Sequence, residues 1–126
     1  MSIIDLGILD RFFDEVCDKE IEILEDIAGD CVNETQSLAK QIQNSFTVKD
    51  WEVFNRSAHS MKSTSKALGG VKLSAHAEEM EHTSADYKKP DFDPSALTEN
   101  VALLNAMVVE FTEALRNEVA KNGGSI

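Results

Sequence analysis

Residues 58–73 read Ala-His-Ser-Met-Lys-Ser-Thr-Ser-Lys-Ala-Leu-Gly-Gly-Val-Lys-Leu, and this stretch decides the fold. Projected at about 100° per residue, one face of a helix collects Phe54, Ala58, Met61, Ser65 and Leu68. Gly69-Gly70 ends that helix, because only glycine enters the left-handed C-cap conformation without steric cost. So short a connection forces the next helix, predicted over 71–87, to run back antiparallel. The stretch therefore predicts a helical hairpin.

The rest of the chain also has helical periodicity, with further helices predicted over 5–17, 19–46 and 95–121. Thr47-Val-Lys-Asp50 is read as a capping box that starts the helix through His59, and Ser95 as the cap of the last helix. The predicted fold is all-α, an antiparallel four-helix bundle with a short additional N-terminal helix. The expected organisation is one domain, 1–126, with the N-terminal helix in 1–18, the bundle in 19–121 and a flexible tail in 122–126.

Composition excludes several classes of protein. The net charge of −11 argues against nucleic acid, where binding requires neutralisation of phosphates. No apolar run approaches the roughly 20 residues of a membrane span, and the start of the chain lacks the features of a signal peptide. A cytoplasmic protein is therefore expected, and nothing demands an oligomer, so we expect a monomer.

Cys17 and Cys31 form no Cys-x-x-Cys motif and are expected to be reduced, with Cys31 packed as a small hydrophobe.

His59 lies in a basic island of this acidic chain. Residues 47–75 carry five cations against Asp50 and Glu52, a net charge of +3, which leaves −14 for the remainder. His59 projects more than 90° from the buried face, with Lys62 and Lys66 following it at helical spacing. Its other near neighbours are Asn55, one turn back, and Ser63, one turn on. An imidazole that is mostly neutral at pH 7, beside cations that attract phosphate, indicates a phosphate acceptor. The alternative is a chance cluster on a solvated face.

The chain offers neither a nucleotide site nor a convincing metal site of its own. It has no Gly-rich loop of the P-loop or kinase type, so a phosphoryl group must come from another protein. Glu79 and His82 match the Glu-x-x-His element of di-iron bundles, but no second such element exists. His76 and His82 lie six residues apart, not at the spacing of co-facing ligands. No metal is expected, and Glu78, Glu79 and Glu81 are read as the solvated face of their helix.

The residues around His59 resemble the histidine-containing phosphotransfer (HPt) domains of two-component phosphorelays. The family motif corresponds to Ala58-His59-Ser60-Met61-Lys62-Ser63, then Gly69 and Leu73, closing at Met80-Glu81. The lead-in Lys49-Asp-Trp51 is similar too, and the resemblance covers the whole chain. It implies that His59 is phosphorylated, that Lys62 stabilises the phosphoryl group, and that Gly69 is a turn residue.

The helical projection adds Lys66 to the phosphate-stabilising residues. Ser63 departs from the family pattern, which has glycine at this position. Its small hydroxymethyl group is compatible with docking, but it could instead narrow partner choice or hydrogen-bond the phosphoryl group. The implied partners are a hybrid sensor histidine kinase and response-regulator receiver domains. The chain would need no cofactor, because the Mg²⁺ is expected on the receiver, and it would act as a phospho-carrier rather than an enzyme.

The first predicted helix carries two apolar stripes. Leu6, Leu9, Phe13 and Val16 form the stripe expected to be buried, while the second consists of Ile4, Ile8 and Phe12. Either the short helix buries both stripes, or Ile8 and Phe12 form a docking patch for a receiver domain, as the resemblance favours. A different class of function stays open as well, namely a helical adaptor that binds a partner without phosphotransfer.

Overall fold

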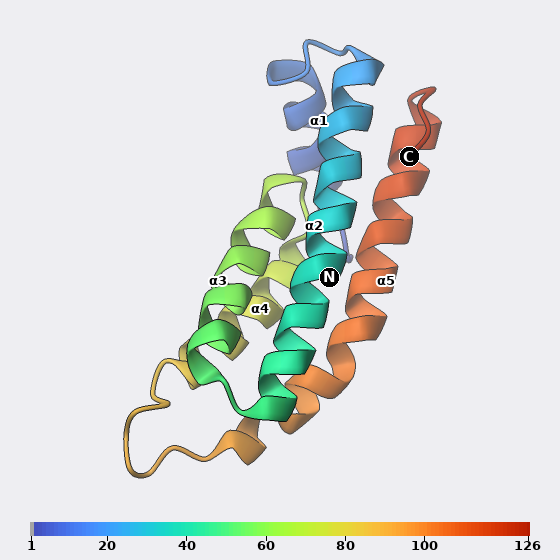
Figure 1. Ribbon diagram of the computed structural model, residues 1–126. Helices are drawn as coiled ribbons and strands as arrows, with labels where there is room; N and C mark the ends of the chain where they lie inside the picture. The colour runs from blue at the N-terminus through green and yellow to red at the C-terminus, as the bar shows by residue number, and fades with distance from the viewer. Residues whose placement is uncertain (1) are drawn as a thin grey trace.

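The computed structural model describes residues 2–126, and these form an antiparallel four-helix bundle with an extra N-terminal helix (Figure 1). No strand occurs among the described residues, so the predicted all-α fold is confirmed. The helices are α1 (Leu6–Glu15), α2 (Ile21–Val48), α3 (Trp51–Ala67), α4 (Val71–Ser84), the 3₁₀ turn η1 (Pro94–Leu97) and α5 (Thr98–Lys121).

The four long helices follow one another around the bundle. α3 packs between α2 and α4, and α5 closes the ring against α2 and α4. At about 1.5 Å per residue, α2 is roughly 42 Å long and α3 roughly 26 Å, so α2 extends beyond the end of α3. α1 lies beside this extension of α2 (Figure 1).

The core consists of the predicted apolar faces. The predicted α3 face is fully buried, and so is the α4 stripe of Leu73, Ala77, Met80 and Ser84. On α5, Val101 is only partly buried, whereas Leu104, Val108, Phe111 and Leu115 are buried, as is Leu97 at the end of η1. Burial of these side chains is the main favourable term in folding.

The hairpin turn depends on both of its glycines. Gly69 has φ +85°, and its carbonyl accepts a hydrogen bond from Asp5 N at 2.7 Å, which ties the start of α1 to the turn. A Cβ on Gly70 would lie 2.6 Å from Phe111 Cε1 and 2.8 Å from Ser65 O. The turn therefore needs glycine for its left-handed backbone and for the close approach of α5.

Two predicted helix caps are wrong. Thr47 belongs to α2, where its hydroxyl donates to Gln43 O, and α2 ends at Lys49 in the left-handed conformation. Asp50 caps α3 by accepting a hydrogen bond from Val53 N at 3.2 Å. Asp93 caps η1, where Ser95 donates to it through both its main-chain N–H and its hydroxyl, and α5 itself begins after Leu97 without a side-chain cap.

The predicted stripes of α1 are also partly wrong. Leu6 and Val16 are 48% and 56% exposed, whereas Ile4, expected on the outer stripe, is 3% exposed. Leu9 is the buried residue of α1, with Ile8, Phe12 and Phe13 half-buried. The chain before the helix turns Ile4 into the core, so the helical spacing from Ile4 does not apply.

The C-terminal residues fold back on α2. Ser125 N donates to Glu25 Oε2 at 2.7 Å, and Gly124 packs so closely on Ile21 that a Cβ there would lie 2.8 Å from its side chain. Ile126 packs partly buried against the core. The segment predicted as a flexible tail thus lies against the bundle in this structure.

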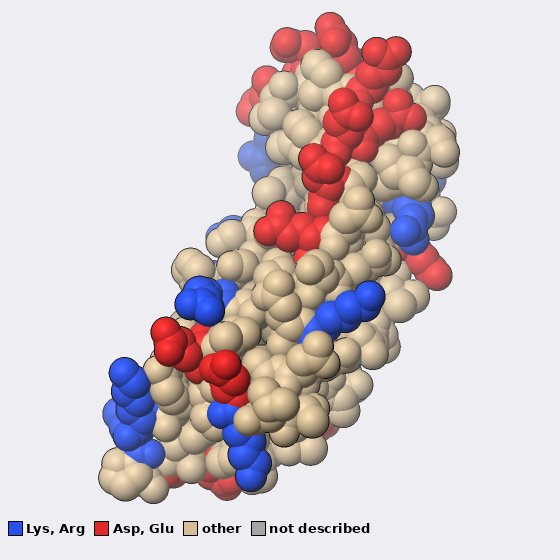
Figure 2. All heavy atoms as spheres, viewed as in Figure 1, with Lys and Arg blue, Asp and Glu red and all other residues tan. Residues whose placement is uncertain are grey.

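Charge is unevenly distributed over the surface. Figure 2 shows acidic side chains gathered at the end of the molecule where α1 and the N-terminal half of α2 lie. Residues 5–34 contain eleven acidic residues against Arg11 and Lys19, a net charge of −9. The α3 segment, by contrast, lies in the basic island of residues 47–75.

Candidate functional site

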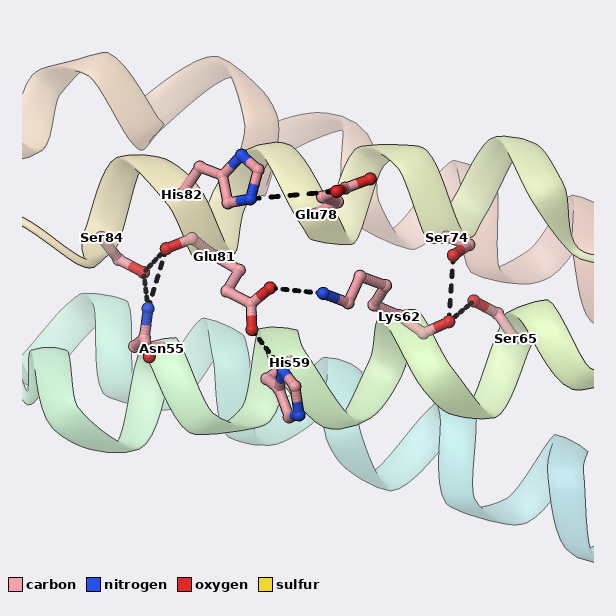
Figure 3. A network of polar contacts seen from close by, with 9 residues as sticks. All are labelled: Asn55, His59, Lys62, Ser65, Ser74, Glu78, Glu81, His82 and Ser84. Atoms are coloured by element: carbon pink, nitrogen blue, oxygen red, sulfur yellow. Dashed lines mark hydrogen bonds and ion pairs between the residues drawn. The ribbon is translucent and has the colours of Figure 1, made fainter.

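His59 lies on the outer side of α3, and its side chain is 60% exposed. Its Nδ1 contacts Glu81 Oε2, which reaches across from α4, while the Nε2 edge of the ring turns away from α4 (Figure 3). The helical projection of His59 towards solvent is therefore confirmed by its exposure. The structure adds that one ring nitrogen is held and the other faces outward.

Glu81 is the residue that the sequence prediction missed. Its side chain is only 15% exposed, and its carboxylate accepts from Lys62 Nζ at 2.7 Å as well as from His59. The assignment of Glu81 to a solvated helix face is wrong. α3 and α4 pack antiparallel after a tight turn. Glu81 faces α3 across this contact, whereas Glu78 and Glu79 are exposed.

Position relative to the turn was the signal that could have revealed Glu81. His59 lies ten residues before Gly69 and Met80 lies ten after Gly70, so an antiparallel hairpin brings positions 80 and 81 level with His59. Met80 fills the core, which leaves Glu81 at the edge between α3 and α4.

The two hydrogen bonds to Glu81 set its charge. Burial on its own would raise the pKa of the Glu81 carboxyl, but the bonds from Lys62 and His59 outweigh burial and hold that pKa below its usual value of 4.5. The hydrogen bond between Lys62 and Glu81 also raises the pKa of the Lys62 ammonium above 10.5. At neutral pH the site therefore contains a carboxylate and an ammonium ion beside the imidazole.

The carboxylate also determines the state of the imidazole. An ionised carboxylate can only accept hydrogen bonds, so Nδ1 of His59 carries the proton. In a neutral ring the lone pair is then on Nε2, the nitrogen that faces solvent (Figure 3). The geometry presents a nucleophilic nitrogen to solvent.

Asn55 is directed at α4 rather than at solvent. Its Nδ2 donates to Glu81 O at 2.8 Å and to Ser84 Oγ at 3.0 Å, and the side chain is half-buried between α3 and α4. Further along the same pair of helices, Ser74 Oγ donates to Lys62 O at 3.0 Å. These bonds fix the spacing of the helices on either side of His59.

The remaining predicted site residues lie on the outer face of α3 and on α1. Ser63 and Lys66 are exposed, and within residues 2–126 Lys66 forms no ion pair. A groove of about 260 Å³ separates α1 from the end of α3. Its lining comprises Ile8, Arg11, Phe12, Glu15, Val16 and Ala67. The two predicted docking residues therefore share one groove.

The other candidate groups are not assembled into a site. His82 Nε2 lies 3.8 Å from Glu78 Oε1 on the same helix, and residues 2–126 contain no group of three or more potential metal ligands. Cys17 and Cys31 are buried free thiols. Burial raises the pKa of the Cys31 thiol to about 11, against the opposing hydrogen bond with Thr35. In the described part of the chain, no helix is both long and apolar enough to cross a bilayer.

Comparison with known families covers most of the bundle. Residues 26–120 match the family model described as Hpt domain. Comparisons with curated proteins and with solved structures gave no significant match. The match includes α3 and α4 with all of His59, Lys62 and Glu81, and it covers well over half of the chain. The chain therefore belongs to the Hpt domain family, whose members are phospho-carrier modules of two-component phosphorelays and interact with receiver and kinase domains.

Proposed function

We propose that His59 accepts a phosphoryl group from a phospho-aspartate of one receiver domain and passes it to an aspartate of another. The observation that carries this proposal is the outward Nε2 of His59, with Nδ1 held by Glu81. The donor receiver would belong to a hybrid sensor histidine kinase and the acceptor to a response regulator. The Mg²⁺ would be bound by the receiver.

The transfer is balanced without any proton movement at the attacking atom. The Nε2 lone pair forms the N–P bond as the P–O bond to the aspartate carboxylate breaks, and the carboxylate leaves with the electron pair. Nδ1 keeps its proton, and Glu81 offsets the positive charge that develops on the ring. The reverse reaction, with a second receiver, uses the same groups.

Lys62 and Lys66 would stabilise charge on the phosphoryl oxygens. The Lys62 Nζ lies 2.7 Å from Oε1 of Glu81, the carboxylate that also contacts His59, so the ammonium is close to the reacting ring. A lysine ammonium on a flexible stem can contact Glu81 and a phosphoryl oxygen without a fixed geometry. Lys66 lies exposed, one turn further along α3.

A receiver would dock over α3 and the groove beside α1. Ile8 and Phe12 line that groove with Ala67, which lies two turns beyond His59 on α3. Half-buried apolar side chains that line an open groove offer a surface of the kind typical of partner sites. Ser63 lies between His59 and Ala67, where its hydroxymethyl group would face the receiver.

Labelling tests the proposal directly. The protein is incubated with a receiver domain phosphorylated by its kinase with radioactive phosphate, and the label is tested for acid lability and alkali stability. We expect label on the wild type and on His82→Gln, and none on His59→Gln. Label that survives in His59→Gln would refute the assignment. Failure of every tested receiver to label the wild type would favour the alternative, a helical adaptor without phosphotransfer.

A further inference from the structure

The outer surface of α3 continues onto an apolar face with an acidic rim. From His59, eight residues lead to Ala67, about 12 Å along the helix, where the groove with Ile8 and Phe12 begins. Val16, which also lines that groove, is 56% exposed. An apolar receiver surface would contact this face.

Three acidic side chains border the apolar face. Glu15 lines the groove itself and is exposed. On α2, Cys31 Sγ lies 3.6 Å from Thr64 O, which fixes where α2 passes α3. Asp30 and Glu34 are exposed next to Cys31, one turn apart and on the same side of α2. Both therefore lie beside the α3 turns that follow His59.

Little positive charge offsets this rim. Residues 5–34 carry a net charge of −9, and the one ion pair formed there among the described residues is that of Lys19 with Asp14, at 3.7 Å. Figure 2 shows how densely acidic side chains cover this end of the molecule. The surface around His59 thus changes from basic on α3, through apolar, to acidic on α1 and α2.

We propose that this surface selects receiver domains that carry basic side chains where they contact α1 and α2, beside the acidic pocket that meets His59. The inference rests on the proposed function, since it names which receivers that site accepts. The matching receiver has an acidic zone facing α3, an apolar zone facing the groove, and a basic zone facing Glu15, Asp30 and Glu34. A receiver that is acidic throughout would be repelled.

Charge at the rim of an interface acts chiefly on the rate of association. Because it is screened over about 8–10 Å at physiological salt, its effect weakens as ionic strength rises. Selection by this surface should therefore affect the second-order rate of transfer and leave the rate within the complex unchanged.

The test reverses the rim charges and compares them with a matched set elsewhere. One variant combines Glu15→Lys, Asp30→Lys and Glu34→Lys. The control combines Glu99→Lys, Glu110→Lys and Glu113→Lys, all exposed on α5, across the bundle from α3. Each triple changes the net charge from −11 to −5. The probe is the phosphorylated receiver domain that labels the wild type fastest among a panel.

We expect the rim variant to lower kcat/KM for transfer about tenfold at low salt, with kcat unchanged and the loss reduced in 0.5 M salt. The α5 control should differ from the wild type by less than twofold. Equal losses in both triples, no loss, or faster transfer by the rim variant would each overturn the inference. In those cases the wild type still labels and His59→Gln does not, so the proposed function stands. If no receiver labels the wild type, the proposed function is wrong, and the inference fails with it.

Discussion

The α3–α4 hairpin and the acidic end formed by α1 with the first half of α2 use charge in different ways. In the hairpin, Glu81 contacts both His59 and Lys62, and its side chain is 15% exposed. At the acidic end, eleven acidic residues have one ion pair among them, Lys19 with Asp14, whose side chains are 72% and 61% exposed. Position, rather than number of charges, decides which of them orient a neighbouring group. Apart from Asp5, which caps α1, and Glu25, which accepts from Ser125 N, the other charges act at a distance, through the field of the whole surface.

The largest expected effect comes from breaking the turn of the hairpin, to which the start of α1 is tied through the bond from Asp5 N to Gly69 O. In Gly70→Ala the new Cβ would lie 2.6 Å from Phe111 Cε1 and 2.8 Å from the Ser65 carbonyl, so α5 must shift. We expect a loss of about 2–3 kcal/mol in the free energy of unfolding, measured by urea denaturation. Gly123→Ala is the control, because its Cβ meets nothing within 4 Å and only the backbone strain of φ +91° remains. Equal losses in the two variants would show that the close contacts around Gly70 do not add to the cost of a Cβ.

Removing the carboxylate of the hairpin should slow transfer without unfolding the bundle. In Glu81→Ala the imidazole loses the acceptor that keeps the proton on Nδ1, so both tautomers and more ring orientations are populated. We expect the rate of His59 labelling to fall about tenfold, since an exposed ring can still reach the receiver. Glu79→Ala, exposed on the same helix, should label at the wild-type rate. If Glu81→Ala is labelled as fast as the wild type, Glu81 does not orient the His59 ring.

Most of the fold could be predicted from sequence because it depends on periodicity and on one turn. The faces of α3 and α4 follow from apolar spacing, and Gly69-Gly70 dictates that they run antiparallel. What could not be predicted depends on contacts between segments far apart in the chain. Ile4 is buried because Asp5 N binds the carbonyl of Gly69, a bond that helical periodicity does not encode. Glu81 lies level with His59 in the hairpin, but a charged residue on an amphipathic helix is ordinarily read as solvated.

Acid should erase the contribution of the hairpin carboxylate to stability. A carboxyl whose pKa is lowered by folding stabilises the native state above its usual pKa of 4.5, and this contribution is lost as pH falls through the lowered value. The wild type should therefore exceed Glu81→Gln in free energy of unfolding at pH 7, and the difference should shrink below pH 4.5. Urea denaturation of both proteins at pH 7, 5 and 3 measures it. A difference that stays constant over this range would mean that Glu81 contributes through packing instead of charge.

The smallest effect is expected from the ion pair of the acidic end. Asp14→Ala removes a 3.7 Å contact between two exposed side chains, and such pairs contribute about 0.5 kcal/mol or less to stability. Its removal also relieves repulsion among neighbouring acids, which acts in the opposite direction. The midpoint of thermal unfolding should therefore stay within about 2 °C of the wild type. A loss of stability as large as that of Glu81→Gln at pH 7 would mean that exposed and half-buried charges stabilise this bundle alike, and the contrast between its two regions would fail.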